Sequence, residues 1–109
     1  MIVSTTSVLE GKEIIEYKGI VFGEVISGVN FFRDIMASVR NIVGGRSAAF
    51  EKELFAAREN ALDEMCKHAE EKGCNAVVGV KFDYESFGSD GLMLMVNVTG
   101  TAVVYRDKQ

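Results

Sequence analysis

The chain has 109 residues, a length that suits one domain and is short for two. Hydrophobic residues make up 48% and charged residues 26%, the balance of a globular protein rather than of a disordered or fibrous chain. The net charge is −4 and the 12 Lys and Arg are scattered, so no basic stripe is available for a phosphate backbone. We therefore expect no nucleic-acid partner.

The N-terminal residues contain neither the basic segment nor the apolar run of an export signal. No apolar stretch approaches the roughly 18 residues that a membrane span requires. The two cysteines, Cys66 and Cys74, are too few for a disulfide framework. These features predict a cytoplasmic protein with reduced thiols and no membrane partner.

The first quarter of the chain predicts two strands, a short one at residues 2–5 and a longer one at Glu13–Ile26. Gly19 and Gly23 interrupt the longer strand, which indicates a bulge, a sharp bend or a close approach by another backbone. A regular strand would carry Ile15, Tyr17, Val21 and Val25 on one face and Ile14, Ile20, Phe22 and Ile26 on the other. Both faces are therefore partly apolar.

The middle of the chain changes to a period of three to four residues, which is typical of helices. Residues 32–43 predict a short helix of about three turns that ends before Gly44. Ser47 can cap a second, much longer helix that runs to Lys72 and ends at Gly73. The apolar residues of this helix cover about half of its circumference, so we expect it to contact more than one surface.

Alternation returns after the long helix and predicts an antiparallel hairpin. Its strands are Cys74–Tyr84 and Leu92–Tyr105, joined by a loop at Ser86–Asp90. On the first strand, one face is expected to carry four apolar or aromatic side chains: Val78, Val80, Phe82 and Tyr84. The second strand is apolar on both sides of its first half, with Met93 and Met95 on the second face.

Together these elements predict one α+β domain over residues 1–109, built from a small antiparallel sheet, one long helix and one short helix. Helices on one face of the sheet would leave Met93 and Met95 exposed on the other face in a monomer. Either the short helix folds over that face, or copies of the chain associate. The excess of apolar residues favours association.

Cys66, His68 and Cys74 are a possible soft-metal cluster, because thiols and imidazole are ligands of zinc and heavier metals. On a helix, however, positions 66 and 68 lie about 200° apart and point to opposite edges. The C-x-x-C spacing of many zinc sites is also absent. We therefore interpret Cys66 as a core residue, His68 as a boundary residue and Cys74 as incidental.

A glycine-rich segment, Gly44-Gly45-Arg46-Ser47, leads into the long helix. Free amides at a helix N-terminus and an arginine suit an anionic group such as phosphate or carboxylate, to which Arg33 of a neighbouring subunit could add. The segment does not match the phosphate-loop pattern G-x-x-x-x-G-K-[ST], so a connector between two helices is the other interpretation.

Charged residues supply the remaining candidates. Arg58 falls inside the apolar arc of the long helix and needs a partner, either a carboxylate of the sheet or of a second subunit, or a ligand. Asp83 and Glu85 lie on one strand face with Lys81, as in a cation site or simply a solvated face. With one histidine and no nucleophile elbow, the sequence contains no catalytic signature.

A series of short motifs runs in order through nearly the whole chain: Ser4-Thr5-Thr6, Leu9-Glu10-Gly11, Glu16-Tyr17, Gly23-Glu24, Arg33-Asp34, Val43-Gly44-Gly45-Arg46-Ser47, Ala57-Arg58, Ala76-Val77-Val78-Gly79, Asp83-Tyr84-Glu85, Met93-Leu94-Met95-Val96 and Gly100-Thr101-Ala102-Val103. With these motifs the chain resembles the YbjQ-like family. The resemblance implies a small bacterial cytoplasmic α+β protein whose subunits assemble into a ring, a pentamer, with strands contributing to the subunit contacts.

The family carries the label "putative heavy-metal-binding domain", which implies a metal ion but identifies no ligands. The carboxylates that match its motifs are Asp34, Asp83 and Glu85, which suit hard ions better than soft heavy metals. The cysteines and the histidine fall where the resemblance implies variation. Three functions stay open: a ring-forming binding or scaffold module, a metal-binding protein, and a sensor or enzyme for a small anionic ligand.

Overall fold

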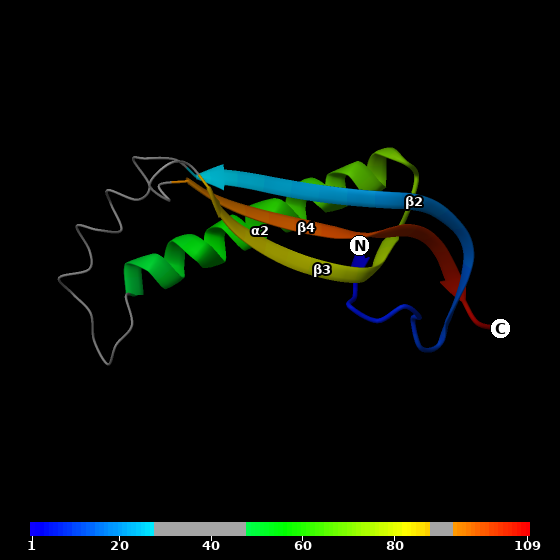
Figure 1. The fold of residues 1–109 in the computed structure, drawn as a ribbon. Helices are drawn as coiled ribbons and strands as arrows, with labels where there is room; N and C mark the ends of the chain where they lie inside the picture. The colour runs from blue at the N-terminus through cyan, green and yellow to red at the C-terminus, as the bar shows by residue number, and fades with distance from the viewer. Residues whose placement is uncertain (28–47, 88–92) are drawn as a thin grey trace.

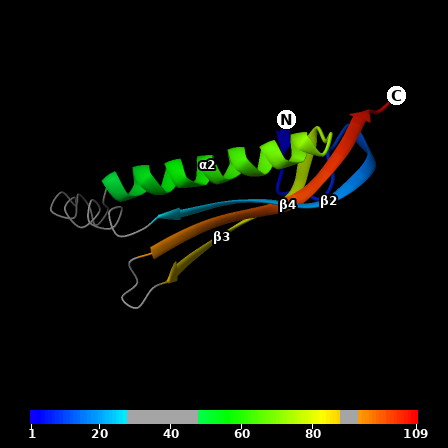
Figure 2. The same cartoon turned by 90° about the horizontal axis from the view of Figure 1, so that it is seen from above.

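The computed structural model describes residues 1–27, 48–87 and 93–109. Within these residues the chain forms β1 (Ile2–Val3), β2 (Lys12–Ser27), α2 (Ala48–Glu71), β3 (Ala76–Phe87) and β4 (Met93–Asp107) (Figure 1). The strands make one sheet in the order β1-β3-β4-β2, and α2 lies along one face of it (Figure 2). The α+β class is therefore confirmed. The predicted short helix, at residues 32–43, lies outside the described residues.

The sheet is mixed, whereas the sequence predicted an antiparallel one. β2 and β3 both run antiparallel to β4, but β1 runs parallel to β3 through the pairs Ile2–Ala76 and Val3–Val77. The prediction of an entirely antiparallel sheet is wrong because alternation indicates a strand but not the direction of its neighbour.

The long helix lies almost where the sequence predicts it. It begins one residue after Ser47 and ends at Glu71. Gly73 has a φ of +77°, a left-handed conformation that glycine adopts without steric cost. The amides of Gly73 and Cys74 donate hydrogen bonds to the carbonyls of Glu70 and Ala69, at 2.9 and 3.0 Å, and so satisfy the last turn.

The helix packs on the sheet through small side chains. The buried row of α2 consists of Ala57, Ala61, Met65 and Ala69, and the facing core residues of the sheet include Val21, Val77, Val96, Val98 and Ala102. Gly23 lies directly under α2, where an added Cβ would stand 1.9 Å from the carbonyl oxygen of Ala61. The expectation of a close backbone approach is therefore confirmed at Gly23.

Two bulges in β2 change which residues share a face. The register against β4 shifts between Ile14 and Glu16 and again before Gly19. Tyr17 pairs with Val103, which packs on the side away from α2, so Tyr17 lies on that side too. The prediction that placed Tyr17 with Val21 is wrong, because each inserted residue reverses the alternation.

A third shift corrects the prediction for β3. Gly79 adopts a φ of +63° within a register shift between Val78 and Lys81. Val80 packs in the core under α2, whereas Val78 packs with Val103 in a smaller cluster on the opposite face. The predicted common face of Val78 and Val80 is therefore wrong for the same reason as in β2.

The contact at Gly23 leads to a stability prediction. We expect Gly23→Ala to lower the free energy of unfolding by about 1–3 kcal/mol, because the new methyl group has to push two backbones apart. Urea denaturation followed by circular dichroism measures the change. The exposed helix variant Glu59→Ala serves as control, and an equal effect of both variants would contradict the close contact.

Candidate functional site

The face of the sheet opposite α2 exposes large apolar side chains, and we call it the outer face. On β2 it comprises Tyr17, Ile20, Phe22 and Ile26, which are 65%, 75%, 51% and 55% exposed. Met93 and Met95 of β4 are half-buried. The predicted apolar surface therefore exists, but its exposed part lies on the edge strand β2 more than on β4.

The β3 side of the outer face is charged. Lys81, Asp83 and Glu85 are all exposed there, and the Lys81 Nζ lies 3.6 Å from an Asp83 carboxylate oxygen. Among the described residues, no three His, Cys, Asp or Glu side chains gather where they could hold a metal ion. Asp83 and Glu85 are thus placed together on a solvated face, without a third ligand from the described part of the chain.

His68 reaches from α2 to the edge of β2 that pairs with no described strand. Its Nδ1 lies 2.9 Å from the carbonyl oxygen of Phe22, and the two rings meet edge to face with centroids 6.1 Å apart. This carbonyl belongs to the edge strand of the sheet, where a further strand would otherwise pair. The sequence placed His68 at a boundary, but it gave no sign of this contact.

Both cysteines are free thiols, and neither is fully exposed. Cys74 is buried in the core under α2, and Cys66 is half-buried on the helix. Burial raises the pKa of both thiols, and for Cys66 the N-terminal amino group opposes that shift in part. Both side chains are therefore neutral thiols near pH 7, the form that binds soft metals least well.

An open hollow of about 420 Å³ lies where the N-terminus meets the end of α2, and its lining residues are Met1, Ile2, Glu70, Cys74, Asn75 and Tyr105. The Asn75 side chain donates to the Tyr105 carbonyl at 3.0 Å and accepts from the Tyr105 amide at 2.9 Å. The amide that could orient a ligand is thus already occupied. The sequence did not indicate this hollow, because its walls come from separate segments.

The other predicted residues divide into two groups. Arg58 is half-buried on α2 and makes no ion pair with the described residues. The predicted ligand-binding residues outside the described part of the chain are Arg33, Gly44, Gly45, Arg46, Ser47 and Asp34, the last of which is also a metal candidate. The anionic-ligand site at these residues stays a prediction.

Residues 1–106 match the model of the YbjQ family, described as "Putative heavy-metal-binding". The chain belongs to this family. A UPF0145 protein of Clostridium botulinum (strain Alaska E43 / Type E3) is 59% identical over 103 residues, 94% of this chain and 97% of that protein. A UPF0145 protein of Listeria ivanovii is 60% identical over 104 residues, 95% of this chain and 94% of that protein. The resemblance read from the motifs is confirmed.

The fold also resembles a solved structure. A protein of unknown function from Pediococcus pentosaceus, of the DUF74 family, superposes with a TM-score of 0.57 over 97% of this chain and 98% of its own. At 14% sequence identity this likeness concerns the fold alone. In the described part of this chain, no helix has the length and apolar character to cross a membrane.

The buried thiols lead to a prediction about pH. Because burial raises the pKa of both thiols above its ordinary value, their contribution to stability is complete below that ordinary value. It is lost as the pH rises through the folded-state values, since the unfolded chain then ionises more readily. We expect the free energy of unfolding to fall more between pH 8 and pH 10 in the parent than in Cys66→Ser/Cys74→Ser.

Urea denaturation at one protein concentration, with reductant present, measures both slopes. Both proteins share every other ionisable group, so the difference between the two slopes isolates the thiols. Equal slopes would contradict the raised pKa values.

Proposed function

We propose that the protein is a homo-oligomeric binding or scaffold module of the bacterial cytoplasm, whose subunits assemble through the outer face into a closed ring, a pentamer. The observation that supports assembly most directly is the exposure of Ile20 and its neighbours Tyr17, Phe22 and Ile26 on β2. Four large apolar side chains, each more than half-exposed on one strand, are typical of an interface between proteins.

The shape of the subunit supports the same proposal. Its Cα radius of gyration is 17.2 Å, whereas a compact chain of this length has a value of about 13 Å. Within the described residues, a thin sheet with one helix buries one face well and leaves much of the other uncovered. A second copy can cover the remaining apolar surface without any change of fold.

We expect size-exclusion chromatography with light scattering to give an oligomer, with a mass about five times the 11.9 kDa of one chain if the ring is a pentamer. Ile20→Glu should convert it to monomer, because the interface would then bury an unpaired carboxylate. Val8→Glu is the matched control, since Val8 is 67% exposed and lies in the loop before β2 rather than on a strand of the sheet. A parent chain that is monomeric at micromolar concentration and moderate salt would overturn the proposal.

Metal binding is a second candidate function, favoured by the family description. The acidic residues that match the family motifs suit a hard divalent ion, whereas the shielded thiols suit soft metals poorly. A site shared between subunits could bring Asp83 and Glu85 together with carboxylates of another copy.

Elemental analysis of protein purified without chelator tests this second candidate. We expect any metal present in stoichiometric amount to be retained in Cys66→Ser/Cys74→Ser and lost in Asp83→Asn/Glu85→Gln. Loss of metal from the cysteine variant would show that the thiols are ligands. Absence of metal from the parent oligomer would remove the candidate.

A further inference from the structure

We infer that His68 and Glu64 of α2 form a binding site for one borderline divalent transition-metal ion, such as Cu²⁺, Ni²⁺ or Zn²⁺, beside the edge of β2. The site consists of an imidazole whose Nδ1 is held by a backbone carbonyl, and a carboxylate one helical turn before it. It is separate from the carboxylates of β3, and it does not depend on self-association because both ligands belong to one helix.

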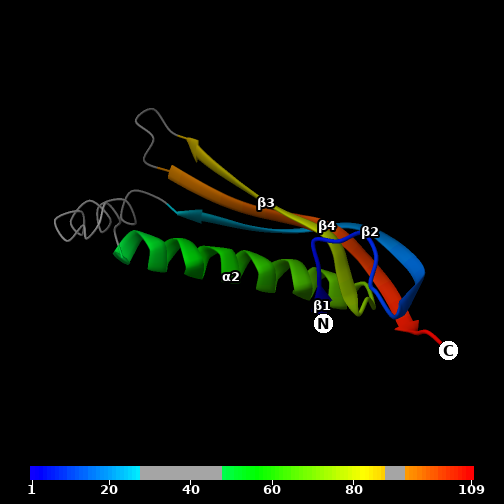
Figure 3. The ribbon, with the colours of Figure 1, turned by 90° about the horizontal axis from the view of Figure 1, so that it is seen from below.

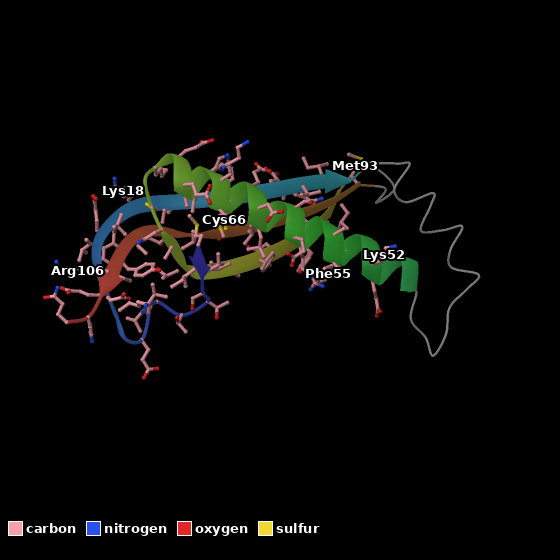
Figure 4. All side chains as sticks on the ribbon, turned by 180° about the vertical axis from the view of Figure 1, so that it is seen from behind. Lys18, Lys52, Phe55, Cys66, Met93 and Arg106 are labelled. Atoms are coloured by element: carbon pink, nitrogen blue, oxygen red, sulfur yellow. The ribbon has the colours of Figure 1, made fainter. Side chains whose placement is uncertain are left out.

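The last turns of α2 bring the site to the edge of the sheet. The helix runs alongside β2 in the opposite direction (Figure 3), and its C-terminal end lies near Lys18 of this strand (Figure 4). The two backbones meet at Gly23 and Ala61. Side chains one to two turns after Ala61 can therefore reach the outer carbonyls of β2, and His68 does so at Phe22.

The contact with Phe22 fixes the state of the imidazole. A carbonyl oxygen can only accept, so Nδ1 of His68, 2.9 Å away, carries the proton. In the neutral ring Nε2 then has the free lone pair, and it points away from the strand. The edge-to-face contact with the Phe22 ring restricts rotation further. Metal-bound histidines typically donate their second N–H to a carbonyl or carboxylate in this way, which orients the ring and strengthens the ligand.

Glu64 supplies the second ligand. It precedes His68 by four residues, so the two side chains are neighbours on one face of α2, with Cβ atoms about 5–6 Å apart. Side chains in a helix lean towards its N-terminus, which inclines the imidazole towards Glu64. Glu64 is half-buried and forms no ion pair with the described residues. Its carboxylate is therefore available to a cation beside Nε2.

The charges around the pair are mixed. Glu71 follows His68 by three residues and adds a carboxylate to this side of α2, whereas Lys72 follows it by four and opposes a bound cation. Glu24 of β2, two residues after Phe22, is a further carboxylate on the edge strand. These three side chains are exposed, so water screens their effects. The choice of ion therefore depends mainly on the two ligands.

One imidazole nitrogen and one carboxylate oxygen suit borderline ions. Mg²⁺ and Ca²⁺ prefer oxygen ligands alone, and soft ions prefer thiolates. Two protein ligands agree with the finding that no three His, Cys, Asp or Glu gather around one point in the described ranges. Water or a small ligand completes the coordination, so the ion exchanges readily and is supplied by added metal rather than retained through purification. We expect Cu²⁺ to bind more tightly than Ni²⁺ or Zn²⁺.

Calorimetric titration of the chelator-treated protein with Cu²⁺ and Zn²⁺ tests the site. The chain contains one histidine, so every imidazole signal reports on His68. We expect one ion per chain and, for Cu²⁺, an electron paramagnetic resonance spectrum with coupling to an imidazole nitrogen. His68→Gln and Glu64→Gln should each weaken binding at least about tenfold, a loss that removal of even an outer partner of a metal ligand typically causes. The amide in His68→Gln can still donate to the Phe22 carbonyl, which preserves the edge contact.

Glu59→Gln is the matched control and should bind as the parent does. Glu59 is exposed and lies about 180° from His68 around the helix, so it removes the same charge outside the site. Parental affinity in His68→Gln, a Cu²⁺ spectrum without imidazole coupling, or no binding by the parent would each overturn the site.

Two further variants separate this site from the other candidate ligands. Cys66→Ser/Cys74→Ser and Asp83→Asn/Glu85→Gln should both bind Cu²⁺ with parental affinity. Loss of binding in either double variant, with His68→Gln unaffected, would assign the ion to the thiols or to β3 and overturn the site on α2. The oligomeric state of the parent enters none of these outcomes, so failure of the proposed assembly is recognised separately by light scattering.

Discussion

The close approach of α2 to β2 at Gly23 and Ala61 fixes the arrangement of the whole subunit. Gly23 has no side chain, and the row of α2 that faces it consists mostly of alanines. The two backbones can therefore come close together, and α2 is held above β2 and β4. A helix is about 10 Å across, which corresponds to roughly two strands at a spacing of about 4.8 Å. Once α2 covers β2 and β4, it cannot also cover β3. Tyr84 and Phe55 are exposed because of this limit, and Val96 is buried because it lies under α2.

The core and the proposed interface therefore have one origin. Within the described residues, a single helix against a four-stranded sheet leaves one face and one flank without cover, and the β2 part of that face is mostly apolar, whereas its β3 part is charged. A polar outer face on β2 would give a monomer with the same core. The exposure of Ile20 and Phe22 is instead the observation on which the proposed self-association rests. Arg58, half-buried among apolar neighbours, fits the same pattern.

The sequence predicted those features that depend on local signals. Ser47 and Gly73 bracket the long helix within one residue of its true start and two of its true end, because caps and periodicity act locally. Tyr17 and Val78 were assigned to the wrong faces, since a bulge leaves the composition unchanged while reversing the alternation. The parallel pairing of β1, the contact of His68 and the lining of the hollow depend on residues far apart in the chain. No local pattern reports such distances.

The two bulges of β2 also limit how the length of this segment can vary during evolution. Each inserts one residue, and together they cancel, so Ile14 and Ile20 lie on the same side of the sheet. Deletion of only one inserted residue would move every preceding side chain of β2 to the opposite face of the sheet. Ile14 would then leave its cluster with Leu9 and Val103. Loss of both would preserve every orientation. Homologous chains should therefore differ here by two residues or by none.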